Sequence, residues 1–225
     1  ALAREHFSHS LARYEQAGNT WGMARSHDYL GNVARMVGDY QQADAHYERC
    51  LALYEETGDR DGIAGALNSL GSAAGTRGAY DEARTYFERS LAICREIDDR
   101  FGIASASHNL SNIAYLHGDY AAAKALRRNV LGICREIGFR WGVANSLRHL
   151  GDVHRQLGER SEAQRLYEES RLLEEESGNR RGLALVHNSL GDLALDTGDM
   201  VDAARQYRRA IDIGIDIDSP PVILT

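Results

Sequence analysis

The sequence lacks any long apolar run, and it therefore has no candidate for a bilayer-crossing helix, which needs about 20 consecutive apolar residues. The opening residues ALAREHF contain no Met and are not basic, so they do not resemble a signal peptide. Proline occurs only twice, at Pro220 and Pro221, where it ends helical order. From these absences we expect a cytoplasmic protein that makes no contact with a membrane.

Cysteine is also scarce. Cys50, Cys94 and Cys134 give an odd number, and the last two take equivalent places in the near-copies AICREI and GICREI. Neighbouring repeats that pack as helices keep equivalent Cα atoms about 10 Å apart, beyond the roughly 7 Å that a disulfide allows. We therefore expect buried, reduced thiols, as in a cytosolic protein.

Lysine is nearly absent, since Lys124 is the only lysine among 26 basic residues. Such a bias towards arginine is common in GC-rich genomes and indicates a bacterial source. The net charge of −7 gives no general attraction to nucleic acid or to anionic membranes. With 43% hydrophobic and 26% charged residues, the composition is that of a globular protein.

Catalytic motifs are missing as well. No H-E-x-x-H, G-x-S-x-G or C-x-x-C occurs, so we expect no enzyme and no cofactor. The glycine-rich stretch 71–78 lacks the Lys-Ser/Thr of a phosphate loop. His149 and His154 are five residues apart, off the spacing that directs two imidazoles to one metal ion, so we expect no metal site. The acidic run 174–176 is typical of a solvated helix face.

What the sequence does contain is a repeat of 40 residues with no insertion. When the sequence is aligned with itself at this period, leucine, glycine, alanine and aromatic residues recur at equivalent positions, and each such set is called a column. The clearest columns are Leu30, Leu70, Leu110, Leu150 and Leu190; Gly31, Gly71, Gly151 and Gly191, with Ser111; Gly38, Gly78, Gly118, Gly158 and Gly198; Ala43, Ala83, Ala123, Ala163 and Ala203; and Tyr47, Phe87, Tyr167 and Tyr207, with Arg127.

Each period predicts two helices of about 17 residues. Small and apolar residues recur every three or four positions in both, and aspartate or asparagine stands at the expected N-caps, as at Asp39, Asp59 and Asn179. Short turns make the two helices antiparallel neighbours. Small residues such as Gly31 and Ala43 allow close approach, and the ring of Tyr47 fills the space that remains against the next hairpin.

A lone hairpin of this kind cannot bury its apolar face, so the repeats must stack. The sequence predicts an all-α, right-handed α-solenoid of about 11 helices, formed by one domain over residues 1–217. Neither end has a polar capping helix, and we expect the chain to be a piece of a longer protein. Its expected parts are a half repeat at 1–17, hairpins at 20–56, 60–96, 100–136, 140–176 and 180–217, and a tail at 218–225.

The leucine-glycine pair, the following glycine, the alanine and the ring resemble the tetratricopeptide repeat (TPR). Here six residues are added to that family's usual 34, and the E-x-G-D-R ends look like those of animal spindle-orientation adaptors and of bacterial regulators with a nucleotide-binding switch domain. The resemblance covers about residues 1–217. Departures are Ser111 for glycine, Arg127 for the ring, Arg160 and Met200 for tyrosine, and the lack of proline near the repeat ends.

The resemblance implies that the first helices line a concave groove whose inward face binds a ligand. Three columns spaced three or four residues apart share that face. The groove residues assigned in this way are Asn32, Arg35, Asn68, His108, Asn112, Tyr115, Arg148, Asp152, Arg155, Asn188 and Asp192.

These residues form a polar ladder. Asn68, Asn112 and Asn188 can each donate to and accept from a peptide backbone, while Arg148 and Arg155 can grip a carboxylate or phosphate. Asparagine is a poor filler of helix interiors, so its recurrence favours binding. The alternative is a solvated groove whose charges pair within the repeats.

A second partial column contains Trp21, Phe101 and Trp141 at the starts of first helices. We expect these rings to pack beneath the turns between repeats; the alternative is an aromatic patch that binds a ligand.

We therefore expect a non-enzymatic module that binds a protein or peptide, as the sensor or scaffold segment of a larger bacterial signalling or transcription-regulating protein. One alternative is a domain that senses a small molecule or signal peptide. Another is self-association through the uncapped ends and the apolar tail residues 222–224. No direct contact with nucleic acid is expected of this segment.

Overall fold

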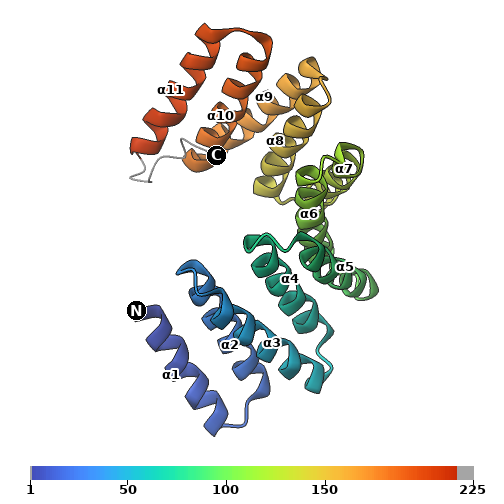
Figure 1. The fold of residues 1–225 in the computed structure, drawn as a ribbon, viewed down its shortest axis with the longest axis vertical. Helices are drawn as coiled ribbons and strands as arrows, with labels where there is room; N and C mark the ends of the chain where they lie inside the picture. The colour runs from blue at the N-terminus through green and yellow to red at the C-terminus, as the bar shows by residue number, and fades with distance from the viewer. Residues whose placement is uncertain (1, 217–225) are drawn as a thin grey trace. The chain divides into compact units, whose positions relative to one another are not determined.

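The computed structural model describes residues 2–216, and these form 11 α-helices with no strand among them (Figure 1). This confirms the predicted all-α fold of helical hairpins. The helices are α1 (Leu2–Gln16), α2 (Thr20–Met36), α3 (Tyr40–Thr57), α4 (Arg60–Thr76), α5 (Tyr80–Glu96), α6 (Arg100–Leu116), α7 (Tyr120–Glu136), α8 (Arg140–Gln156), α9 (Arg160–Ser177), α10 (Arg180–Thr197) and α11 (Met200–Asp216).

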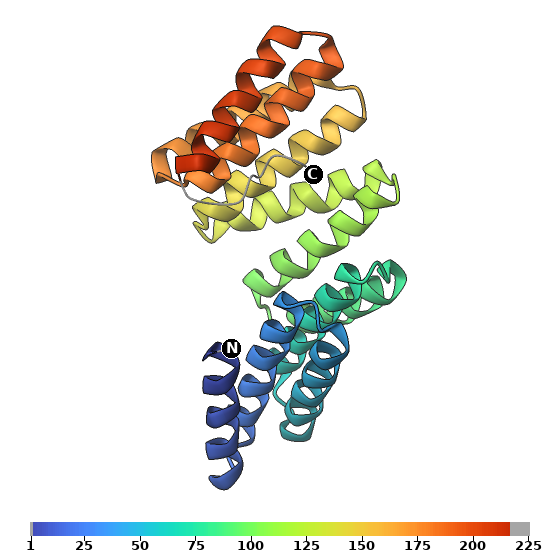
Figure 2. The same cartoon turned by 60° about the vertical axis from the view of Figure 1, so that its left-hand side comes forward.

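The chain divides into two compact units, residues 1–113 and 114–225, with the boundary inside α6. In the first unit α2 and α3 form one hairpin and α4 and α5 the next; in the second, α8 pairs with α9 and α10 with α11 (Figures 1 and 2). The predicted repeat limits within one domain stay a prediction, and the tail 218–225 lies outside the described residues. No helix within 2–216 has the length and apolar character needed to span a bilayer.

The helix starts and ends follow the predicted capping residues. Asn19, Asp59 and Asn179 accept hydrogen bonds from the backbone N–H three residues later, at 2.9, 3.0 and 3.2 Å. Second helices are capped in the same way by the aspartates Asp39, Asp119 and Asp199. The turn glycines adopt positive φ, which costs glycine little.

Inside the hairpins that have both residues, the ring column packs on the glycine column. A Cβ at Gly31 would lie 2.5 Å from a ring carbon of Tyr47, and one at Gly151 would lie 2.5 Å from Tyr167. Tyr47 also belongs to a buried cluster with Leu70 of the next hairpin. Only a residue without a side chain permits this contact, which confirms the predicted use of the column.

The two helices of a hairpin are joined by bonds that recur at fixed spacing. Ser90 Oγ donates to the Ala64 carbonyl at 2.9 Å in the first unit, and Ser170 Oγ donates to the Ala144 carbonyl at 2.8 Å in the second. These bonds link the two helices of a hairpin. Ion pairs between residues 36 apart, including Arg140 with Glu176 at 2.6 Å, link the start of a first helix to the end of its second helix. Such exposed pairs each contribute about 0–1 kcal/mol.

Candidate functional site

The eleven predicted groove residues all lie on first helices, and every one is partly buried. Asn32 and Arg35 are on α2, Asn68 is on α4, and the others follow on α6, α8 and α10. A residue that is neither core nor fully exposed is suited to contact a ligand, but many of these side chains already have partners in the protein. Their role in binding stays a prediction.

In the first unit, Asn32 is held by its own hairpin. Its Nδ2 donates to the Asp28 carbonyl at 3.0 Å and to Asp28 Oδ2 at 3.2 Å, and its Oδ1 accepts from the Tyr47 hydroxyl at 3.1 Å. Asp28 also accepts from Ser69 of the next hairpin at 2.9 Å. Burial raises the pKa of the Asp28 carboxyl, and the hydrogen bond from Ser69 opposes this shift.

Asn68 is the next step of this ladder and is less constrained. Its Oδ1 accepts from Asn109 Nδ2 of the following first helix at 3.0 Å. No hydrogen bond of its Nδ2 to another described residue is recorded, so this amide can still donate to a ligand. The link between residues 41 apart repeats the one from Asp28 to Ser69.

In the second unit the position equivalent to Asn32 belongs to Asp152, which is the centre of a polar cluster. Asp152 Oδ1 accepts from the Tyr167 hydroxyl at 2.8 Å and from Ser189 at 3.3 Å. Arg148 Nη1 donates to Oδ2 at 3.4 Å, and His149 Nδ1 lies 3.3 Å from the same oxygen. The charge of Arg148 is therefore paired with Asp152 on the same helix.

Burial and the neighbouring charges shift the pKa values of the titrating groups in this cluster. Burial acts to raise the pKa of Asp152, but the hydrogen bond from His149 and the charge of Arg148 lower it overall. Burial also lowers the pKa of His149 and keeps its imidazole neutral. Arg127, the departure from the ring column, is only 2% exposed, and burial lowers the pKa of its guanidinium to about 9.

Arg155 is likewise paired within the protein. Its Nη1 donates to Asp196 at 2.8 Å, and its Nη2 lies 3.7 Å from Asp192. Asp192 also accepts from the Tyr207 hydroxyl at 2.6 Å. Burial, followed by the hydrogen bond to Asp192, raises the pKa of Tyr207 to about 12. In this unit Arg148 pairs with Asp152 within one repeat, as in the alternative interpretation, whereas Arg155 pairs with the next repeat.

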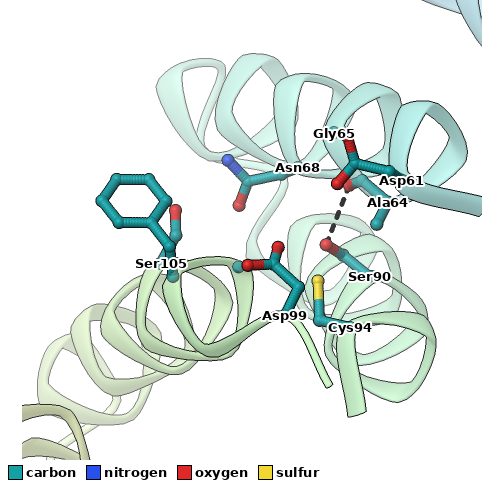
Figure 3. A pocket seen from close by; sticks show the side chains of 10 residues that line it. Asp61, Ala64, Gly65, Asn68, Ser90, Cys94, Asp99 and Ser105 are labelled. Carbon is teal, nitrogen blue, oxygen red and sulfur yellow. Dashed lines mark hydrogen bonds between the residues drawn. The ribbon is translucent and has the colours of Figure 1, made fainter. Parts of the chain in front are cut away.

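A pocket of about 210 Å³ opens on the first unit beside Asn68 (Figure 3). It lies between α4 and α6, with the end of α5 as its floor. Its lining residues are Asp61, Ala64, Gly65, Asn68, Ser90, Cys94, Asp99, Phe101, Gly102 and Ser105. Of these, only Asn68 belongs to the predicted groove set.

Comparison between repeats supplies the signal that would have located the pocket. Gly65 stands where the other repeats have Arg25, Ser105, Asn145 and Leu185, and a Cβ built on it meets nothing within 4 Å. Cys94 stands where two other repeats have the larger Tyr54 and Glu174, although the next repeat has the equally small Cys134. Of these repeats, only that of Gly65 lacks a side chain in the first column, and together with the small Cys94 this leaves an open space.

Two predictions about individual side chains were wrong. Trp21, Phe101 and Trp141 do not pack beneath the turns, because each leaves more than half of its surface exposed. Glu174 is not part of a solvated face; it is 4% exposed and accepts from Asn179 Nδ2 at 2.7 Å. The polar N-cap next to it allows the carboxylate to be buried.

The chemistry of the described residues offers no reactive group at this site. Within residues 2–216 no three His, Cys, Asp or Glu side chains come together as metal ligands. The three cysteines are free and buried, as predicted. Burial, followed by the charge of Asp99, raises the pKa of Cys94, so the pocket contains a neutral thiol rather than a thiolate.

Solved structures with a similar fold include three of note. BtubC (BKLC) from P. vanneervenii has a TM-score of 0.82 and 19% identity, over 97% of this chain and 92% of its own. A Rap protein complexed with competence and sporulation factor has a TM-score of 0.76 and 15% identity, over 88% of this chain and 55% of its own. The Rap conjugation gene regulator of plasmid pLS20, in complex with the Phr* peptide, has 0.74 and 16%, over 91% of this chain and 57% of its own.

These likenesses concern the fold alone, and this chain spans little more than half of either Rap protein. No curated protein sequence matches the chain. The family model described as "Tetratricopeptide repeat" matches residues 1–56, 62–136 and 142–215. The chain belongs to the tetratricopeptide repeat family.

Proposed function

We propose that this chain is a non-enzymatic module that binds a protein or peptide on the first-helix face of its repeats. The observation that carries the proposal is the pocket at Gly65, which adjoins the Asn68 amide. A backbone carbonyl of a ligand that passes Asn68 finds a donor, and a side chain beside it finds an open space.

The relatives with bound peptides support this reading. The structures of two Rap proteins contain the competence and sporulation factor or the Phr* peptide, and both share this fold. A scaffold already ordered by bonds such as Asn68 with Asn109 loses little conformational entropy when a ligand binds. Main-chain recognition by side-chain amides suits an extended or helical segment.

The wider context is part of the same proposal. We place the chain in the cytoplasm as the sensor or scaffold segment of a larger bacterial signalling or transcription-regulating protein, and its 40-residue repeats in the class found in such regulators. The free thiols support a reducing compartment. A small-molecule sensor is less favoured, because about 210 Å³ is below the roughly 300–1,000 Å³ of pockets for drug-sized ligands.

The test is selection from a random peptide display library against the whole chain. Enriched peptides are then measured against a Gly65→Trp variant, since the indole fills space that the protein leaves empty. Thr85→Trp, at an exposed place on second helix α5, is the matched control. We expect at least a tenfold loss of affinity for Gly65→Trp and less than about twofold for Thr85→Trp, which corresponds to more than about 1.4 kcal/mol against less than about 0.4 kcal/mol.

Circular dichroism verifies that both variants keep the helical content of the parent. Failure to enrich any peptide, or equal affinity of the Gly65→Trp variant and the parent, contradicts the proposal.

A further inference from the structure

We infer that the pocket between α4 and α6 receives a basic side chain, arginine or lysine, of the bound partner. The inference rests on the proposed function and names what one subsite of it recognises. Of the pocket residues, the sequence assigned only Asn68 to the groove; Phe101 belongs to the aromatic column and Cys94 to the expected buried thiols.

The charge of the lining points to a cation. Asp61 and Asp99 bring two carboxyl groups to opposite sides of the space (Figure 3), and none of the ten lining residues is basic. No ion pair of Asp61 or Asp99 with another described residue is recorded. A guanidinium or ammonium that enters therefore meets acceptors that are not already occupied by a salt bridge.

The other lining residues suit the methylene groups and the planar guanidinium of an arginine side chain. Ala64, Gly65 and Gly102 form an apolar surface of small residues, against which methylene groups can pack. Phe101 lines the same pocket and is 59% exposed, and an aromatic ring beside the pocket suits a neighbouring cation. The exposure of Phe101, which contradicts the predicted packing beneath the turn, suits contact of its ring with the partner's cation.

The size of the pocket fits one side chain. Its volume of about 210 Å³ exceeds several times the roughly 30 Å³ share of one water molecule in the liquid. It is nevertheless smaller than typical pockets for drug-sized ligands. Burial keeps the Cys94 thiol uncharged, so the attraction for a cation comes from the two aspartates.

The preceding repeat contains an internal example of this arrangement. Arg25 stands one period before Gly65, and its guanidinium carbon lies 4.8 Å from the centroid of the Trp21 ring and 5.5 Å from that of Tyr29. A guanidinium thus already packs on aromatic rings along this face of a first helix. In the next repeat that arginine is replaced by glycine, and the carboxyl group of Asp61 replaces the indole.

The test uses small probes and does not depend on finding the partner. Acetyl-arginine-amide and the uncharged, nearly isosteric acetyl-citrulline-amide are titrated separately into the amide-labelled chain and followed by NMR. We expect the arginine probe to shift the amide resonances of Gly65, Asn68 and Ser105, with an affinity at least about threefold above that of citrulline.

Two conservative variants remove the charges. Asp61→Asn and Asp99→Asn should each weaken the arginine probe by about three- to fivefold and leave the citrulline probe unchanged. Asp81→Asn is the matched control, because it removes one charge from exposed α5 outside the pocket. Its effect should be less than about 1.5-fold at physiological salt, where distant exposed charges are screened.

Equal binding of the two probes, or equal loss in Asp61→Asn and Asp81→Asn, overturns the inference. Its failure is distinguishable from that of the proposed function. Peptides whose affinity falls in Gly65→Trp, but which show no preference for arginine or lysine, refute only the basic subsite. An arginine probe that binds at Gly65 while no peptide is ever enriched supports the subsite and refutes the peptide-binding module.

Discussion

The first-helix faces of the two units are built from the same columns but differ in what they leave open. In the second unit Asp152 bonds to Tyr167 and Arg148, and Arg155 pairs with Asp196. In the first unit a pocket opens beside Asn68. The same scaffold therefore accommodates two different surfaces. In the second unit long charged side chains pair with one another, and in the first unit Gly65 leaves an open pocket.

The comparison predicts that the second unit depends more on its polar face for stability. Asp152→Ala should cost about 3 kcal/mol, because it leaves the fully buried Tyr167 hydroxyl and the Arg148 charge without their acceptor. Asn32→Ala in the first unit removes one acceptor from Tyr47 and should cost about 1–2 kcal/mol. Urea unfolding followed by circular dichroism measures both.

Asp152→Asn is the control for this comparison, since it keeps an acceptor for the tyrosine hydroxyl and should lose less than Asp152→Ala. A cost for Asn32→Ala equal to or above that of Asp152→Ala would show that the polar face stabilises both units alike.

A histidine pair gives the first unit a second distinguishing property, a dependence on pH. His27 Nδ1 lies 3.0 Å from His46 Nδ1, whereas the equivalent pair in the second unit is His187 with Gln206, at 2.8 Å. Burial, then the charge of His46, lowers the pKa of His27 to about 4. Since this folded pKa is below the unfolded value of about 6.5, the stabilisation is complete above pH 6.5 and is lost as pH falls towards 4.

We predict that His46→Gln, which copies the pair of the second unit, reduces this loss by about 1 kcal/mol, a value discounted for partial exposure. Melting temperatures of the parent and the variant at pH 7 and pH 5 test it. Identical pH dependence of the two proteins would exclude the histidine pair as the source.

The smallest predicted difference concerns helix capping. Ala79 makes no side-chain cap at the start of α5, whereas Asp119 accepts from the Ala122 N–H at 3.0 Å at the start of α7. Ala79→Asp should stabilise the protein by about 0.5–1 kcal/mol, and Asp119→Ala should destabilise it by about the same amount. Thermal unfolding measures both changes; a loss of stability in Ala79→Asp would mean that the contacts of the Ala79 methyl outweigh the cap.

Much of the fold could be predicted from the sequence because it depends on local rules repeated five times. An N-cap residue such as Asp59 marks the start of a helix. A glycine column beside a ring column, as at Gly31 and Tyr47, indicates that the two helices of a hairpin pack closely there. The division into two compact units was not predicted, since the 40-residue period runs through α6 without any change.

The candidate site was predicted less well for a physical reason. A column identifies which face a side chain occupies, but not which neighbour it bonds. Asn32 and Asp152 occupy equivalent places and bind tyrosine hydroxyls within the protein, which no spacing reveals. The pocket depends on the missing side chain at Gly65 beside the small Cys94, and the loss of a side chain in one repeat is visible only when the repeats are compared position by position.

The links between neighbouring first helices, Asp28 with Ser69 and Asn68 with Asn109, both join residues 41 positions apart. Two successive pairs of neighbouring first helices in the first unit, α2 with α4 and α4 with α6, therefore meet in the same register. A gene that gains or loses one whole period in frame places the same positions opposite each other again. Such an array can change its length by recombination, while substitutions at a single column, as at Gly65, change the surface that each copy presents.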